Sequence, residues 1–212
     1  MNERVASATL RSRRARHTAA AGPALDLDRL IAALKQLART EGLDALNMRR
    51  VAETLGVSAR LLYQHIRSKQ DMIDLLTDEI IGLCDLDLVR GSWQLRLRNA
   101  HVAMRAAYLD YPGAAAIILT RMLHASTRPH ASAIRDGMFE IFRDAGLDRQ
   151  ASEIALVQFA ILTLGGLVAH ENADGGAELI MSPGRVGHAV ALGIEMLIAD
   201  VERIVGTGVP AD

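Results

Sequence analysis

The chain has 212 residues, a net charge of −1 and a hydrophobic fraction of 50%, yet only 3% of its residues are aromatic. This length allows one small domain beside a larger one, and the scarcity of aromatic residues favours helices over sheets. A single cysteine, Cys84, excludes an internal disulfide and suits a reducing cytoplasm, where an apolar setting predicts a buried structural thiol. We see no apolar run long enough to span a bilayer and no signal peptide, so we expect a cytoplasmic protein with no membrane partner.

The charge is divided unevenly along the chain. Residues 1–70 hold 13 basic and 6 acidic side chains, a charge of +7, whereas residues 71–212 hold 11 and 19, a charge of −8. A basic front end on an acidic remainder predicts that the front end meets nucleic-acid phosphates. Residues 1–24 contribute five arginines and are predicted to form a disordered basic arm, which either wraps DNA or is a solvated tail with no role.

Residues 25–70 predict three short helices. The first covers 27–40, with Asp26 as its N-cap and Gly42 as its stop. The second follows Asn47, carries a short apolar stripe, and ends at Gly56. Ser58 then caps a third helix over 59–65. Two short helices joined by a tight glycine-containing turn are typical of a helix-turn-helix unit, although a helical hairpin in a bundle core has the same pattern.

A fourth helix is predicted over 69–88, opened by a capping box that runs from Ser68 to Asp71. Its apolar residues lie on more than one face, so we expect it to join the small domain to a second core. The runs EGL at 41–43, LNMR at 46–49, LGVS at 55–58, LYQH at 62–65 and SK at 68–69 resemble the DNA-binding domain of the tetracycline-repressor (TetR) family.

That resemblance implies which side chains meet DNA. Phosphate contacts are expected from the start of the second helix, the end of the third and the start of the fourth; base contacts are expected from the N-terminal part of the third, as in other helix-turn-helix proteins. The phosphate set is Asn47, Met48, Arg49, Tyr63, His65 and Lys69, and the base-reading set is Ala59, Arg60, Leu61 and Gln64, with Ser58 at the same helix start. Tyr63 also has an alternative interpretation as a packing residue over the turn.

Residues 71–212 predict further helices over 92–110, 112–124, 129–145, 148–171 and 183–205, so the expected fold is all-α. The last two are apolar nearly all round, and a helix of this kind must be buried on every side. A second subunit is the simplest partner for the outer face. In the resembled family, two helices at these places in the chain form a four-helix dimer interface, so we expect a homodimer through 148–171 and 183–205.

The resemblance also places a small-molecule pocket among the helices between 92 and 162. The candidate lining is His101, Met104, Tyr108, Ile118, Met122, His124, Phe139, Phe142, Phe159 and Leu162. The same residues are also ordinary core residues by type and spacing. Ile117 and Asp85 stand where tetracycline repressors are expected to carry drug- and metal-contacting histidines, so we expect no bound metal or other cofactor, and a largely apolar effector.

The seven histidines are scattered, and no metalloprotease, nucleophile-elbow or phosphate-loop motif occurs, so we expect no catalytic site. The sequence therefore predicts a DNA-binding transcriptional regulator that is expected to act as a repressor, binds a palindromic operator as a homodimer and is released by a small, largely apolar effector. The alternative is a helical ligand-binding or adaptor protein that does not read a specific DNA sequence.

Overall fold

The computed structural model describes residues 25–84, 90–122, 127–172 and 182–207, and every regular element in these ranges is helical, as predicted. The elements are α2 (Leu27–Glu41), the 3-10 turn η1 (Leu43–Ala45), α3 (Met48–Leu55), α4 (Ala59–Leu62), α5 (Lys69–Ile81), α6 (Trp93–Leu109), α7 (Ala114–Arg121), α8 (Pro129–Asp144), α9 (Arg149–Glu171) and α10 (Pro183–Thr207). The basic arm predicted over 1–24, together with Asp85 and His124, lies outside the described residues.

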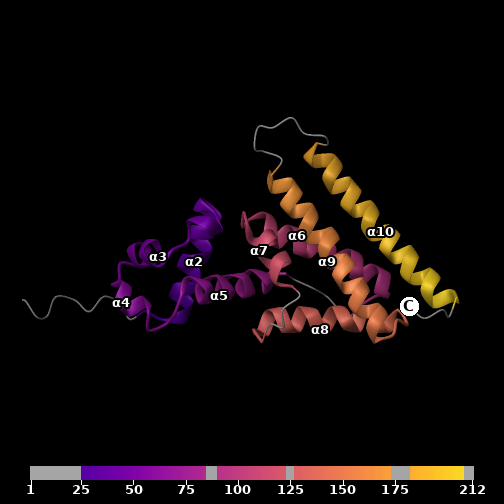
Figure 1. The fold of residues 1–212 in the computed structure, drawn as a ribbon, viewed down its shortest axis with the longest axis horizontal. Helices are drawn as coiled ribbons and strands as arrows, with labels where there is room; N and C mark the ends of the chain where they lie inside the picture. The colour runs from indigo at the N-terminus through magenta and orange to yellow at the C-terminus, as the bar shows by residue number, and fades with distance from the viewer. Residues whose placement is uncertain (1–24, 85–89, 123–126, 173–181, 208–212) are drawn as a thin grey trace, which may run out of the picture.

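The molecule is elongated. The helices predicted to bind DNA lie at one end, and the helices predicted to form the dimer interface lie at the other. Helices α2 to α4 form one end, α5 runs from them into the larger helical domain, and α9 and α10 lie side by side at the far end (Figure 1). Helix α5 contacts α2 in the small domain and α6, α7 and α8 in the large one. It is therefore the element that joins the two domains.

Side-chain caps fix where the N-terminal helices begin. The side chains of Asp26, Asn47, Ser58 and Ser68 each accept a hydrogen bond from the backbone N–H three residues later, at 2.7, 2.9, 3.2 and 3.1 Å. Each bond satisfies an N–H that has no partner within its helix. All four caps were predicted, and the structure confirms them.

Two predicted helices are shorter in the structure than the sequence suggests. The third helix was expected over 59–65, but α4 ends at Leu62, and the backbone N–H groups of Gln64 and His65 bond only three residues back. The fourth was expected to reach 88, but α5 ends at Ile81. At the next position, Gly82, a Cβ would lie 2.8 Å from the His130 ring, so the start of α8 crosses the end of α5 at close range.

One core runs through both domains. Leu30, Leu34 and Leu62 are fully buried in the small domain, while Met72 and Leu76 of α5 are fully buried where the domains meet. Because α5 buries residues toward both sides, its apolar pattern is broader than that of a surface helix. As expected, this helix packs into both domains, but their buried residues form one continuous core and not two.

Helix α9 corrects one expectation from the sequence. It is 23 residues long, with a mean hydropathy of 1.8 in its most apolar window, so by length and composition it could cross a membrane. In the structure it packs against α6, α7, α8 and α10. This packing buries one face of the helix and accounts for much of its apolar character.

Helices α9 and α10 approach each other closely but leave an apolar outer surface. A Cβ at Gly193 would lie 2.8 Å from Leu162 Cδ2, and one at Gly166 would overlap Val190, so glycine is needed at both crossings. On the outside, Ile161 is 54% exposed and Met196 is 65% exposed. Exposed apolar side chains that recur along two adjacent helices are typical of a surface that another protein covers.

Candidate DNA interface and effector cavity

The turn between α3 and α4 is held in a defined geometry. Gly56 adopts φ +66° and ψ 32°, and its N–H bonds to Glu53 O while the N–H of Val57 bonds to Ala52 O. This pair of bonds is a Schellman motif, which requires a left-handed residue that glycine adopts without strain. Ser58 then caps α4 at once, so only three residues separate the two helices.

Helix α2 braces this unit from behind. The Arg29 guanidinium donates a hydrogen bond to the carbonyl of Leu55 at 2.9 Å, satisfying the C-terminal end of α3. Arg50 forms an ion pair with Glu41 at the end of α2. The orientation of α3 is thus fixed by its own caps and by two side-chain contacts to its neighbour.

Most of the residues predicted to meet DNA are exposed. Met48 and Leu61 differ, because both are half-buried and pack against the core. The exposed members are Asn47, Arg49, Ser58, Ala59, Arg60, Tyr63, Gln64, His65 and Lys69. Tyr63 is 53% exposed, so it is available for contact with a partner rather than buried over the turn. We call this exposed set the α3–α4 face.

The positive charges on the α3–α4 face are only weakly neutralised. Arg49 pairs with Glu53 at 2.8 Å, but its side chain is 90% exposed, and such surface pairs contribute little. Within the described ranges, Arg60 and Lys69 form no ion pair with another part of the chain. These cations can therefore pair with phosphates or guanine without giving up a strong internal contact.

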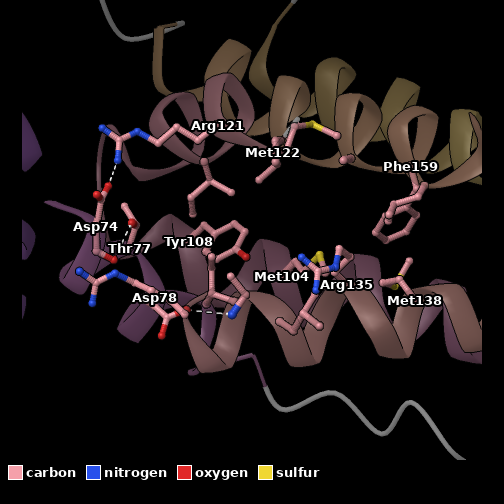
Figure 2. Close-up of a pocket in the computed structure, with 18 of the residues that line it drawn as sticks. Asp74, Thr77, Asp78, Met104, Tyr108, Arg121, Met122, Arg135, Met138 and Phe159 are labelled. Carbon is pink, nitrogen blue, oxygen red and sulfur yellow. Dashed lines mark hydrogen bonds and ion pairs between the residues drawn. The ribbon is translucent and has the colours of Figure 1, made fainter. Parts of the chain in front are cut away.

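A cavity of about 630 Å³ lies in the larger domain among α5, α6, α7, α8 and α9 (Figure 2). Five of the predicted ligand residues line it: Met104, Tyr108, Ile118, Met122 and Phe159. A space of this size, walled mainly by apolar and aromatic groups, is typical of a small-molecule site.

Four other predicted ligand residues that the structure describes do not line the cavity. His101 turns its Nδ1 toward the hydroxyl of Thr163 at 3.1 Å, and Phe142 is fully buried in the core. Leu162 packs against Gly193 of α10, and half-buried Phe139 also lies outside the lining. Apolar residues that recur at helical spacing are predicted to be buried, but the spacing does not show which neighbouring helix or cavity each of them faces.

Sequence reasoning missed the side of the cavity formed by α5 and α8. The additional lining residues are Gln70, Asp74, Thr77, Asp78, Ile81, Arg121, Thr127, Arg128, Ala131, Ile134, Arg135, Met138, Leu156, Ala160 and Leu164. One signal was present. Polar residues at 70, 74, 77 and 78 recur at helical spacing, which indicates that they share one side of this helix.

The polar end of the cavity is organised by α5. Asp74 forms an ion pair with Arg121 at the end of α7, and Asp71 pairs with Arg128 at 3.0 Å (Figure 2 shows the first pair). Asp78 is only 5% exposed, and its carboxylate accepts the backbone N–H of Ala131 at 2.8 Å. Asp78 thereby caps α8 from another helix, where the helix dipole favours a negative charge.

Two groups near the cavity have displaced pKa values. Burial, together with the neighbouring Cys84 thiol, raises the pKa of Tyr108 well above its ordinary value. Burial likewise raises the pKa of Cys84 to about 11, only partly offset by its hydrogen bond with Tyr108. The cavity therefore presents a neutral phenol, and the thiol behind it is also neutral at physiological pH.

The small domain touches the large one at the corner between α6 and α7. The N–H of Leu43 bonds to Pro112 O at 3.2 Å, and the Arg39 guanidinium lies 4.9 Å from the centre of the Tyr111 ring. Lys35 of α2 also pairs with Glu79 of α5 at 3.0 Å. These contacts connect α2 and η1 of the small domain to α5 and to the α6–α7 corner of the large one.

Comparison with known proteins agrees with this geometry. Residues 30–76 match the family model described as bacterial regulatory proteins, tetR family. Residues 30–76 therefore form a DNA-binding domain of the TetR type. It is 32% identical over 128 residues to an HTH-type transcriptional regulator of Saccharopolyspora erythraea, covering 60% of this chain and 53% of that protein. It is 26% identical over 159 residues to the class C tetracycline repressor of Escherichia coli, covering 73% and 70%.

Two of these relatives are matched over only part of their length. The chain spans about half the length of the Saccharopolyspora regulator, and 34% of the repressor DrrR1 of Streptomyces coeruleorubidus, with which it shares 36% identity over 92 residues. The relatives' names describe transcriptional regulators and repressors.

Solved structures share the fold over most of the chain. Apo ActR from Streptomyces coelicolor superposes with a TM-score of 0.74 at 19% identity, covering 89% of this chain and all of that one. A TetR variant from Acinetobacter baumannii in complex with minocycline gives 0.71 at 24% identity, covering 85% and 98%. BioQ with its double-stranded DNA operator gives 0.69 at 20% identity, covering 84% and 99%.

Proposed function

We propose that this chain is a sequence-specific transcriptional repressor that binds an inverted-repeat operator as a homodimer and releases it when a small effector enters the cavity. The observation that carries the proposal is the α3–α4 face. Its cations are exposed on a capped and braced helix-turn-helix within the region that matches the TetR family model. Such a unit inserts the start of its second helix into the major groove.

Dimerisation follows from the apolar outer surface of α9 and α10. Ile154, Ile161, Leu192 and Met196 are each 45% to 65% exposed on these two helices. Covering them with the same surface of a second copy forms an isologous four-helix interface. Two α4 helices about 34–36 Å apart would then read half-sites one helical turn apart.

Release by an effector uses α5 as the shared element. Helix α5 begins at Lys69, directly after the recognition segment, and its residues Asp74 and Thr77 line the cavity. A ligand that fits the cavity better in one arrangement of α5 shifts the dimer toward that arrangement. Moving the populations of the two arrangements from 99:1 to 1:99 requires that the ligand bind the favoured one more tightly by about 5.5 kcal/mol.

The effector is not expected to be Mg-tetracycline, because Ile117 stands at the position proposed for a metal-binding histidine. A titration with Mg-tetracycline should show no binding at micromolar concentration. Micromolar uptake of the drug would refute this part of the proposal.

Selection of bound DNA from a random pool at two salt concentrations tests the proposal. An inverted repeat recovered at both concentrations is the expected result, since phosphate contacts weaken with salt while base contacts retain the preference. Binding that is weak, steeply salt-dependent and indifferent to sequence would instead favour the adaptor interpretation, in which the helical domain binds a ligand without reading DNA.

A further inference from the structure

We propose that the effector is an uncharged aromatic molecule with a hydroxyl or N–H group that donates a hydrogen bond to the side-chain oxygen of Thr77 inside the cavity. This inference deepens the proposed function, on which it rests for the word effector. Two features of the cavity wall support it: the pairing of its charged groups, and the direction of the hydrogen bond that Thr77 already makes.

Each charged side chain among the described lining residues is engaged within the protein. Three ion pairs hold most of them: Asp74 with Arg121, Asp71 with Arg128 at 3.0 Å, and Asp136 with Arg135 at 3.2 Å. The remaining one, Asp78, is buried and accepts backbone N–H groups at the start of α8, at 2.8 Å from Ala131 and 3.4 Å from His130. The wall therefore consists of charges that are already matched.

This matching disfavours a charged ligand of either sign. The contacts join three guanidinium groups to a set of four carboxylates, so the wall has no excess of positive charge. An anion would have to compete with a carboxylate for its guanidinium, and a cation would have to compete with Arg121 for Asp74 or with the N–H groups of α8 for Asp78. Removing one partner leaves the other charge uncompensated in a shielded place, which costs free energy. An uncharged ligand avoids this cost.

Thr77 offers an acceptor for such a ligand. It is 7% exposed, and its hydroxyl donates to the carbonyl of Ile73 at 2.8 Å, within α5. A hydroxyl has a single proton, so the oxygen of Thr77 can make a further hydrogen bond only by accepting one. A ligand that covered this oxygen with an apolar group would forgo that bond in a place with little access to water. A ligand with an O–H or N–H group satisfies it.

The remaining wall suits a flat aromatic body. Three methionines, Met104, Met122 and Met138, line the cavity together with the rings of Tyr108 and Phe159 (Figure 2). Thioethers are polarisable and make favourable contacts with aromatic rings, and aromatic pairs add to area burial. The wall thus combines adaptable aromatic-binding groups with a buried acceptor.

Four probes with the same naphthalene ring system separate these features. 2-Naphthol is a neutral donor, 2-methoxynaphthalene is neutral without a donor, 2-naphthoate is an anion, and 2-naphthylmethylammonium is a cation. Isothermal titration calorimetry of the full chain at pH 7 should show the tightest binding for 2-naphthol, whose hydroxyl stays protonated at this pH as that of tyrosine does. The methoxy probe should bind about fivefold more weakly, the size expected for one neutral hydrogen bond. The two ions should bind more weakly than 2-naphthol by about tenfold or more.

Thr77→Val removes the acceptor and nearly keeps the shape of the side chain. It should weaken 2-naphthol by about fivefold, to the affinity of 2-methoxynaphthalene, and leave the affinity of the methoxy probe unchanged. Thr120→Val is the matched control. The Thr120 hydroxyl also donates to a carbonyl of its own helix, at 2.9 Å from Ile117 O, but the residue is exposed and lies outside the lining. This control should change neither affinity.

A third variant locates the probes. Ala160→Phe fills the cavity from α9 and should abolish binding of both neutral probes while circular dichroism shows an intact helical fold. Binding of 2-naphthol that survives this substitution would place the site elsewhere and overturn the assignment.

Tighter binding of either ion than of 2-naphthol would also overturn the inference, as would an absence of binding by all four probes. Equal weakening of both neutral probes by Thr77→Val, or no effect on 2-naphthol, would remove Thr77 from the site. The calorimetry is read without DNA. Failure to select an operator would therefore refute the proposed function while leaving the probe result intact, so the two failures are distinguishable.

Discussion

Arg60 lies at the start of α4, where the helix-turn-helix geometry brings side chains to base edges. It is exposed, and no contact within the described ranges holds its guanidinium. A guanidinium pairs best with the two acceptors of guanine, and each good bidentate contact discriminates by about 1–3 kcal/mol. This residue is therefore the sharpest point at which to separate base reading from general attraction to DNA.

We predict that Arg60→Ala weakens binding to the selected operator by about 1–3 kcal/mol and relaxes preference at one base pair per half-site. Lys69→Ala provides the comparison, because its ammonium is expected at a phosphate. It should weaken binding to all sequences alike and reduce the salt slope by about 1. Fluorescence anisotropy on single-base operator variants measures both effects. Uniform weakening by Arg60→Ala would identify Arg60 as a phosphate contact only.

His101 predicts a pH dependence of stability. Burial, and secondarily Arg105, lowers its pKa in the folded protein below the ordinary value of about 6.5. Because the unfolded chain then binds more protons in this window, the stabilising contribution is present above pH 6.5 and is lost as pH falls through the folded pKa. The melting temperature should therefore fall less between pH 7.5 and pH 5.0 for His101→Gln than for the natural chain. An identical loss in both would contradict this account.

At the scale of elements, α5 is the helix whose contacts connect the two domains and shape the cavity. Its buried Asp78 supplies the cap that α8 lacks locally, since the N-cap residue Arg128 makes no side-chain capping bond. Asp78→Ala should lower the free energy of unfolding by about 1–3 kcal/mol, because the N–H groups of α8 lose their partner in a buried setting.

Denaturant unfolding of the Asp78→Ala variant measures this loss, with Asp136→Ala on the exposed side of α8 as its control. The control should change stability by less than about 0.5 kcal/mol, as most surface substitutions do. Equal effects of the two substitutions would show that the buried carboxylate contributes no special cap.

The elements differ in how well the sequence predicts them. The ends of a helix depend on the residues beside them in the chain. The positions of α3 and of the turn could therefore be predicted from Asn47, Gly56 and Ser58. The end of α5 was misplaced because it depends on His130, a residue distant in the chain that crosses at Gly82. Local patterns contain no information about such a crossing.

The cavity shows the same limit. Helical spacing predicted that Phe142 and Phe159 are buried, and both are, but only Phe159 faces the cavity. Which buried face borders an empty space depends on how α5, α8 and α9 are packed. The α3–α4 face was easier to predict, because it rests on exposure and on a short motif within a continuous stretch of chain.

At the scale of the whole molecule, the proposed dimer rests on the exposed apolar residues of α9 and α10. Leu192→Glu should weaken dimerisation by about 100-fold or more, since a charge buried without a partner costs several kcal/mol. Val102 on α6 offers a matched control, because it is 64% exposed and Leu192 is 54% exposed. Sedimentation equilibrium should show monomers for Leu192→Glu and dimers for Val102→Glu. The opposite pattern would move the interface to α6.

The central claim is that two α4 helices are held at a fixed spacing by one dimer. The most direct measurement is the affinity for the selected inverted repeat before and after inserting five base pairs between its half-sites. Five base pairs turn one half-site by about half a helical turn, to the opposite face of the duplex. The account predicts that affinity falls to that of a single half-site. Unchanged affinity after the insertion would show that the two recognition helices act independently, and would contradict the account.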